Sequence, residues 1–217
     1  MPTTTTPKIF CTGLSRTGTT SLNDGLEALG LRAIHFPLAL FGRSEDFNAQ
    51  PFRPLLKHGL WGSWQLRREL KALRLHSPLD LFDQYDAFSD LPVPLFYKNL
   101  DRYFPGSKFI HTTRDLNDWL ASMQWLFDQG LEERNWTRGE IGNELHFAQY
   151  HCYQYDEEKL TQAFHRHEQD VQDYFSGREE QLLVLNISKG ELDYQKIAPF
   201  LGKEVPDTPF PTSNKKS

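Results

Sequence analysis

The chain has 217 residues, of which 38% are hydrophobic and 13% aromatic, enough to bury the core of a compact α/β domain. Its formal net charge of −5 gives no overall attraction to nucleic acid or to an anionic membrane surface. Any site for an anion must therefore be built locally, and neither nucleic acid nor membrane is an expected partner.

Two further features favour a cytoplasmic protein. No apolar run approaches the ~20 residues that span a bilayer, and the start, Met1 to Thr6, lacks a signal-peptide core. The two cysteines suggest no disulfide framework. We expect Cys11 in a strand and Cys152 in a helix, both as buried, small apolar residues.

Short apolar runs alternate along the chain with amphipathic stretches. We expect strands near 8–12, 31–35, 85–89, 108–113 and 182–187. We expect helices at 20–29, 64–75, 93–103, 116–128 and 154–175. The alternation predicts a single α/β domain over 1–217, a three-layer sandwich whose parallel sheet of about five strands has helices on both faces. The ends, 1–7 and 212–217, are expected to be flexible.

The first strand leads into a glycine-bracketed loop, Gly13-Leu14-Ser15-Arg16-Thr17-Gly18, and then into a helix. Glycines let the backbone turn tightly and approach a ligand, and the N–H groups and dipole of the following helix attract an anion. The arrangement is P-loop-like. It departs from the nucleoside-triphosphate pattern at Thr19, where that pattern has the lysine that neutralises the terminal phosphates. The cation here is Arg16, whose planar guanidinium can hold two oxygens of a phosphosulfate or a phosphate.

A second motif lies in the run Lys108 to Thr113, which is followed by Arg114 and by a helix that carries Ser122 eight residues later. With Arg16-Thr17-Gly18-Thr19-Thr20-Ser21, it resembles the sulfotransferases that use 3′-phosphoadenosine 5′-phosphosulfate. The resemblance implies that Arg114 and Ser122 bind the 3′-phosphate. It assigns the 5′-phosphosulfate to the loop residues Ser15, Arg16, Thr17, Gly18, Thr19, Thr20 and Ser21. Arg16 would also act in catalysis, by offsetting charge on the bridging oxygen.

One departure weakens the donor assignment. Cytosolic members of the family have a later Arg-Lys-Gly segment that completes the 3′-phosphate site, and Lys189-Gly190 matches it only in part. Either Arg114 and Ser122 suffice together with local backbone, or donor affinity has fallen.

The same resemblance places a general base at the end of a strand between the two motifs. Cytosolic members have a histidine there, followed by leucine and proline, and here Asp90 precedes Leu91-Pro92. A carboxylate can take the acceptor's proton if burial raises its pKa. The alternative for Asp90 is the N-cap of a helix that begins at Pro92, and Asp86 could share the role or face elsewhere.

The histidines add one further candidate for the catalytic base. His35 ends the expected second strand and is the other candidate base, although such a histidine more often forms hydrogen bonds or lines a substrate site. His111 is expected in the core. No metal is expected, because the remaining histidines considered form no convincing ligand set; these are His146, His151, His165 and His167.

The function predicted is sulfuryl transfer to a hydroxyl or amine of a small-molecule or glycan acceptor. The alternatives are a P-loop enzyme of phosphoryl transfer or nucleotide hydrolysis, and a catalytically silent nucleotide-binding module. Acceptor pockets lie in variable loops, here 36–63 and 125–155. Six aromatic residues could line one, or belong to the core: Trp61, Trp64, Trp125, Phe127, Trp136 and Tyr150.

Overall fold

The computed structural model describes residues 6–37, 79–128 and 141–213. The helix expected at 64–75, and most of the expected acceptor loop 36–63, lie outside the described residues. The five expected strands all lie inside them.

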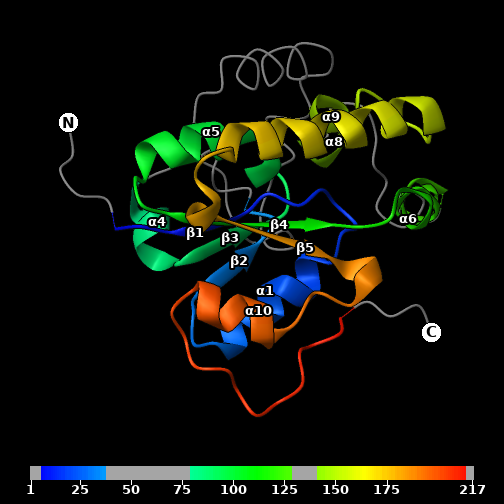
Figure 1. Cartoon of the computed structure of the whole chain (residues 1–217). Coiled ribbons are helices and arrows are strands. Elements are labelled where there is room, and N and C mark those ends of the chain that lie inside the picture. The colour runs from blue at the N-terminus through cyan, green and yellow to red at the C-terminus, as the bar shows by residue number, and fades with distance from the viewer. Residues whose placement is uncertain (1–5, 38–78, 129–140, 214–217) are drawn as a thin grey trace.

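Five parallel strands form one sheet in the order β2-β3-β1-β4-β5 (Figure 1). Their bounds are Ile9–Cys11 for β1, Ala33–His35 for β2, Ala87–Ser89 for β3, Lys108–Thr113 for β4 and Leu182–Asn186 for β5. The predicted parallel α/β fold is therefore confirmed. The order places β1 at the centre, so the loop that follows β1 is flanked by the ends of β3 and β4.

The helices between the strands include the four whose predicted ranges fall in the described residues. These are α1 (Thr19–Ala28), α5 (Val93–Tyr103), α6 (Leu116–Asp128) and α9 (Glu157–Phe175). The bounds of α5 and α6 agree with the prediction, whereas α9 begins three residues later than expected, because the Asp156 carboxylate accepts a hydrogen bond from the Lys159 amide and caps it there. The pattern missed three other helices, α4 (Leu79–Gln84), α8 (Ile141–Tyr150) and α10 (Tyr194–Phe200), and two 3₁₀ turns, η2 (Glu179–Gln181) and η3 (Ile187–Lys189).

Helices cover both faces of the sheet. In Figure 1, α5, α8 and α9 lie over one face, and α1 and α10 lie under the other. Because side chains alternate along a strand, Phe10 of β1 faces α5 and α9 in register with Phe88 and Phe109. The next residue, Cys11, faces α1 and α10. The three phenylalanines form a fully buried row, with the ring centroid of Phe10 5.6 Å from each of the other two.

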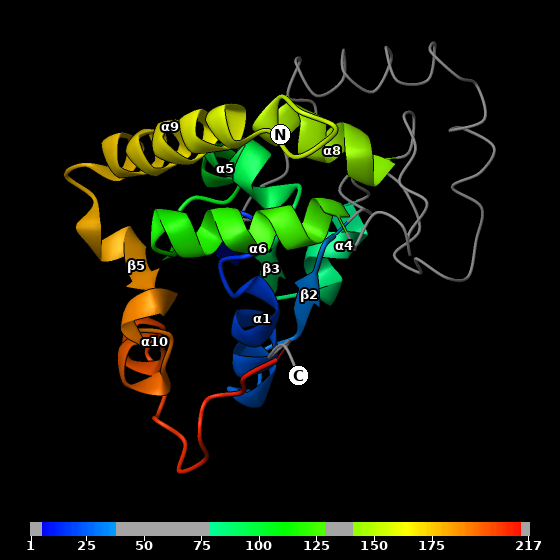
Figure 2. The ribbon, with the colours of Figure 1, turned by 90° about the vertical axis from the view of Figure 1, so that its right-hand side faces the viewer.

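A third cluster lies at the carboxyl edge of the sheet, where α6 crosses in front of the strands (Figure 2). Trp119 of α6 packs against Tyr150 and Phe164, and the loop residue Leu14 belongs to the same buried cluster. The helix that carries one of the sequence motifs is thus packed directly against the loop that carries the other.

One local prediction is wrong. Cys152 lies outside a helix, in the connection between α8 and α9, where α8 has ended and His151 has a left-handed backbone with φ of 59°. Both cysteines are free and buried, as expected. Burial raises the pKa of both thiols, that of Cys152 to about 11, so they stay protonated and unreactive at neutral pH.

Candidate functional site

The loop between β1 and α1 turns where only glycine fits. A Cβ on Gly13 would lie 1.9 Å from Oγ1 of Thr112 and 2.6 Å from its carbonyl oxygen, closer than any contact allows. Gly18 has φ of 86° and occupies the N-cap of α1, where it has no side chain to bond the first amides of the helix. The N-terminal N–H groups of α1 can therefore serve an anion.

Hydrogen bonds fasten this loop to its surroundings. Thr17 Oγ1 donates to the carbonyl of Leu14 at 2.7 Å and lies 2.8 Å from Thr112 Oγ1 of β4. The Ser15 carbonyl accepts from the Trp119 indole at 2.9 Å, and the Ser15 amide donates to the Tyr150 hydroxyl at 3.1 Å. The loop is thus held from β4, α6 and α8, so its conformation is set before any ligand binds.

Arg16 contacts both Ser122 and Arg114, the residues of the second motif. The Arg16 Nε donates to the Ser122 hydroxyl at 3.0 Å, and Arg114 Nη1 donates to the Arg16 carbonyl at 3.4 Å. Arg16 adopts a left-handed backbone with φ of 71°, which costs a side-chain-bearing residue roughly 1–3 kcal/mol. Two cations and a hydroxyl from separate parts of the chain therefore meet at the loop that precedes α1.

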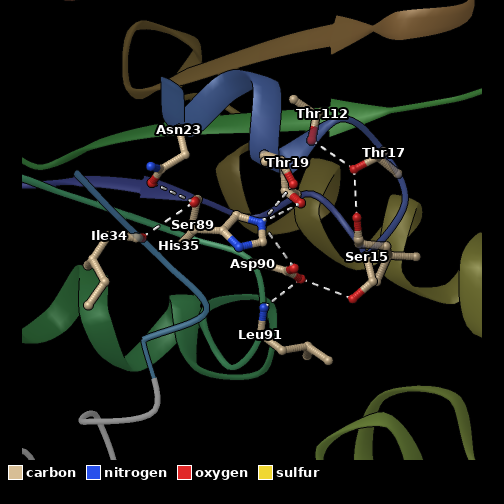
Figure 3. A network of polar contacts seen from close by, with 12 residues as sticks. Ser15, Thr17, Thr19, Asn23, Ile34, His35, Ser89, Asp90, Leu91 and Thr112 are labelled. Atoms are coloured by element: carbon tan, nitrogen blue, oxygen red, sulfur yellow. Dashed lines mark hydrogen bonds and ion pairs between the residues drawn. The ribbon is translucent and has the colours of Figure 1, made fainter. Parts of the chain in front are cut away.

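Asp90 lies beside the same loop (Figure 3). One carboxylate oxygen, Oδ1, accepts from the Ser15 hydroxyl at 3.0 Å and from the Leu91 amide at 2.8 Å. The other, Oδ2, lies 3.3 Å from His35 Nε2. The side chain is only 14% exposed, and the backbone is left-handed with φ of 65°. These contacts hold the carboxylate in one orientation at the end of β3.

The helix-cap alternative for Asp90 does not describe its side chain. Helix α5 begins at Val93 with Pro92 at the N-cap, and the bond from the Val93 amide goes to the Asp90 backbone carbonyl at 2.9 Å. An N-cap side chain would accept from an amide inside the first turn of the helix. The Asp90 carboxylate instead faces the loop and His35.

His35 bridges α1 and Asp90. Its Nε2 lies 3.2 Å from Thr19 Oγ1 and 3.4 Å from Thr20 Oγ1, as well as near Asp90, and its side chain is 31% exposed (Figure 3). Nε2 can donate to one of these oxygens, or accept from a threonine hydroxyl, according to which ring nitrogen carries the proton.

Asp86 faces elsewhere. It forms a two-pronged ion pair with Arg32, whose Nη2 lies 2.8 Å from Asp86 Oδ1, away from the loop. The hydrogen bond from Arg32 lowers the pKa of Asp86 to about 2. Of the two aspartates considered from the sequence, Asp90 alone contacts the loop through a bond that the structure records.

Ser21 is the expected loop residue that lies farthest along α1. Its hydroxyl accepts from the Ser213 amide at 2.9 Å and lies 3.4 Å from the Ser213 carbonyl. Its role in donor binding stays a prediction.

Ser188, next to Lys189, contacts the start of α6 by accepting from the Asp115 amide at 3.2 Å and donating to Asp118 at 2.8 Å.

A buried polar network under the loop was not foreseen. His111, fully buried as expected, has Nδ1 3.0 Å from Thr12 Oγ1 and Nε2 2.9 Å from Glu168. His167 Nε2 donates to the Thr12 carbonyl at 2.7 Å. Burial lowers the pKa of His167 to about 4, so this ring is neutral at pH 7. In the sequence, the only sign of this network was the pair His167 and Glu168 on one helix. Glu168 is 57 positions from its partner His111, and His167 is 155 positions from Thr12, so no local pattern connects them.

The aromatic candidates divide between core and surface. Phe127 and Tyr150 are buried, and Trp125 is 37% exposed, while Trp61, Trp64 and Trp136 lie outside the described residues. A cavity of about 560 Å³ lies along the end of α8 and the start of α9. Its lining begins inside the predicted acceptor loop 125–155 and continues to Lys159, past the end of that loop. Its aromatic lining residues are Phe147, Tyr153 and Tyr155.

The described segments hold neither a metal-ligand cluster nor a membrane-spanning helix. No group of three or more His, Cys, Asp or Glu side chains in them could hold a metal ion. Of the helices that the structure defines, none is long and apolar enough to cross a membrane.

Comparisons with known proteins agree with this fold. The chain belongs to a sulfotransferase family, whose domain model matches residues 8–217. It is 31% identical over 147 residues to the Ava biosynthesis cluster protein M of Aspergillus versicolor, an alignment that covers 66% of this chain and 52% of that protein. The chain thus spans about half the length of this curated relative.

A solved sulfotransferase from Alicyclobacillus acidocaldarius has a similar structure, with a TM-score of 0.52. The match covers 99% of this chain and 87% of that one at 18% identity. At this identity the likeness supports the fold alone.

Proposed function

We propose that the protein transfers a sulfuryl group from 3′-phosphoadenosine 5′-phosphosulfate to a hydroxyl or amine. One observation carries the proposal: the candidate base Asp90 is hydrogen-bonded at 3.0 Å to Ser15, a residue of the same loop that presents Arg16 and the N-terminus of α1. A proton acceptor and an anion site are thereby adjacent, which transfer between a bound donor and an attacking hydroxyl requires.

The donor carries two anionic groups, and the residues present fit both. Arg16 and the first N–H groups of α1 would hold the 5′-phosphosulfate, and Arg114 with Ser122 would hold the 3′-phosphate. Family membership supports this donor. The threonine at position 19 supports it as well, because no lysine stands there to neutralise the terminal phosphates of a nucleoside triphosphate.

The transfer step assigns each residue one task. The acceptor oxygen forms a bond to sulfur, and its proton passes to the Asp90 carboxylate. The bond between sulfur and the bridging oxygen breaks, and the electron pair stays on the 5′-phosphate of the product, where Arg16 offsets the charge. His35 keeps Asp90 oriented. The products are a sulfated acceptor and 3′-phosphoadenosine 5′-phosphate, and Asp90 then releases its proton to water.

The acceptor is proposed to be a small molecule or a glycan, met in the cytoplasm. The A. versicolor relative is named as a biosynthesis cluster protein, which favours a small molecule as the acceptor for this chain too. The aromatic cavity beside α8 and α9 is a candidate for the acceptor's apolar part.

Binding of the desulfated product tests the donor assignment. We expect 3′-phosphoadenosine 5′-phosphate to bind without magnesium, and Arg114→Ala to weaken it by about 1.5–3 kcal/mol through loss of a charge-assisted bond. Calorimetric titration measures both. The matched control is Arg102→Ala, which removes an exposed arginine from the far end of α5 and should leave affinity unchanged.

Two results would contradict the assignment. Tighter, magnesium-dependent binding of ATP would favour the phosphoryl-transfer alternative. Binding of the product without release of sulfate from the donor would favour the silent nucleotide-binding module.

A further inference from the structure

Trp125 is an aromatic residue that the proposed mechanism does not use, although it lies at the site. It follows Ser122 by three residues on α6, so both side chains lie on the same face of that helix. The Arg16 guanidinium carbon is 5.1 Å from the centre of the Trp125 ring, and the Arg16 Nε donates to Ser122. One face of α6 therefore offers Arg16 a hydrogen-bond acceptor and an aromatic surface together.

These contacts act on different degrees of freedom of the Arg16 side chain. The bond to Ser122 fixes the position of one guanidinium edge, whereas an aromatic ring attracts the flat face of the cation. The left-handed backbone of Arg16 directs the side chain out of the loop toward α6. A long, flexible arginine would otherwise lose several rotatable bonds each time it engaged a ligand.

We propose that Trp125 is a positioning residue that holds the Arg16 guanidinium ready for the sulfuryl-transfer step. The proposal rests on the proposed function of Arg16. A cation ordered in advance stabilises charge that develops in the transition state without reorganising at that moment. Substitution of Trp125 should therefore lower turnover. It should change the affinity for the product much less, because the product lacks the sulfuryl group.

The test uses release of sulfate from saturating donor, with water as the acceptor, in single-turnover reactions. We expect Trp125→Ala and Trp125→Leu to lower the rate about tenfold, and Trp125→Phe to recover most of it, because only phenylalanine keeps an aromatic face. Affinity for 3′-phosphoadenosine 5′-phosphate should stay within about twofold of wild type in all three. Tyr103→Ala removes a more exposed aromatic residue, from the end of α5, and serves as the control.

A double substitution shows whether Trp125 acts through Arg16. Arg16→Ala alone should lower turnover more than product affinity, and adding Trp125→Ala should then have no further effect. A tenfold loss that persists in the Arg16→Ala background would overturn the proposal and make Trp125 a substrate-lining residue. Equal rates for wild type, Trp125→Ala and Trp125→Leu would overturn it as well. Failure of the wild-type protein to bind the product or release sulfate is a separate outcome, which contradicts the proposed function itself.

Discussion

Asp90, Ser15 and His35 form the polar centre of the site, and each comes from a different part of the chain. One oxygen of the Asp90 carboxylate accepts hydrogen bonds from the Ser15 hydroxyl and the Leu91 amide, and the other oxygen faces His35. The proposed mechanism gives the two side chains different roles, in which Asp90 accepts the proton and His35 orients it.

Substitution of Asp90 tests this division. Asp90→Asn keeps the size and most hydrogen bonds of the side chain but removes its basicity, so turnover should fall about 10²- to 10⁴-fold while product affinity stays nearly unchanged. Sulfate release in single-turnover reactions and calorimetric titration of the product measure the two quantities.

His35→Gln is the companion variant. Glutamine can still donate to Asp90, so the loss of turnover should be much smaller, well under tenfold. A fully active Asp90→Asn protein would remove Asp90 from the mechanism, and a larger loss in His35→Gln than in Asp90→Asn would make His35 the base.

At the scale of elements, the junction between β1 and α1 depends on how closely β4 approaches it. Thr112 contacts Thr17 across the space in front of Gly13, and Arg114 reaches the Arg16 carbonyl. Thr112 near the end of β4 and Arg114 just after it thus each hold a residue of the loop. The conformation of the loop consequently depends on two neighbouring parallel strands, and not on the loop alone.

Gly13→Ala should disrupt this junction. The added methyl group would overlap both the hydroxyl and the backbone carbonyl of Thr112, so a change of side-chain rotamer cannot relieve it. We expect a loss of about 3 kcal/mol in the free energy of unfolding, measured by denaturant titration, together with weaker product binding.

Gly30→Ala supplies the comparison. A Cβ on Gly30 meets nothing within 4 Å, and its cost arises only from φ of 78°, roughly 1–2 kcal/mol, with product affinity unchanged. Equal effects of the two substitutions on both quantities would contradict the steric explanation for Gly13.

At the scale of the whole molecule, the buried network of Thr12, His111, His167 and Glu168 joins β1, β4 and α9 beneath the site. Burial is the largest single influence on Glu168 and would raise its pKa, but hydrogen bonds from His111 and Thr113 together with the charge interactions of His111 and His167 outweigh it, so the pKa is lowered and Glu168 is ionised at neutral pH. Burial has the opposite consequence for His167, which stays neutral with a pKa of about 4. Protonation of His167 therefore links stability to pH.

We expect the free energy of unfolding to fall as pH decreases from about 6.5 to about 4. In this window the unfolded chain binds a proton at His167 and the native protein does not, whereas above it both forms are neutral and nothing is lost. The contribution is at most about 3 kcal/mol, from a shift of about 2.5 pH units. Denaturant titrations at several pH values measure the slope.

His167→Gln should flatten that slope, because glutamine can still donate to the Thr12 carbonyl but does not titrate. His165→Gln on the same helix changes an exposed histidine and should leave the slope as in wild type. Identical slopes for His167→Gln and wild type would contradict the linkage to His167. Asp86, whose pKa is about 2, loses its contribution to the free energy of unfolding only at pH values below this window. It therefore does not interfere with the slope assigned to His167.

The sequence by itself predicted those features of the structure that neighbouring residues determine. Glycines at both ends of the loop, the apolar runs of the five strands and the periodicity of α5 and α6 gave the architecture, the anion loop and the Arg114–Ser122 motif. The seven-residue helix α10 escaped, because so few turns give too little periodicity to recognise. Cys152 was misplaced for a related reason, since the left-handed His151 ends the helical stretch without a glycine or proline to mark it.

Tertiary structure decided which of the recognised residues meet. Ser15 and Asp90 are 75 positions apart, and Arg16 and Ser122 are 106 apart, yet both pairs are hydrogen-bonded. The strand order brings this about, because β3 and β4 flank β1 and parallel strands end at the same edge of the sheet. The sequence therefore supplied the chemical groups of the site. The direction of β3 puts Asp90 at the carboxyl edge of the sheet and Asp86 at the opposite edge, and the pairing of β2 with β3 places His35 beside Asp90.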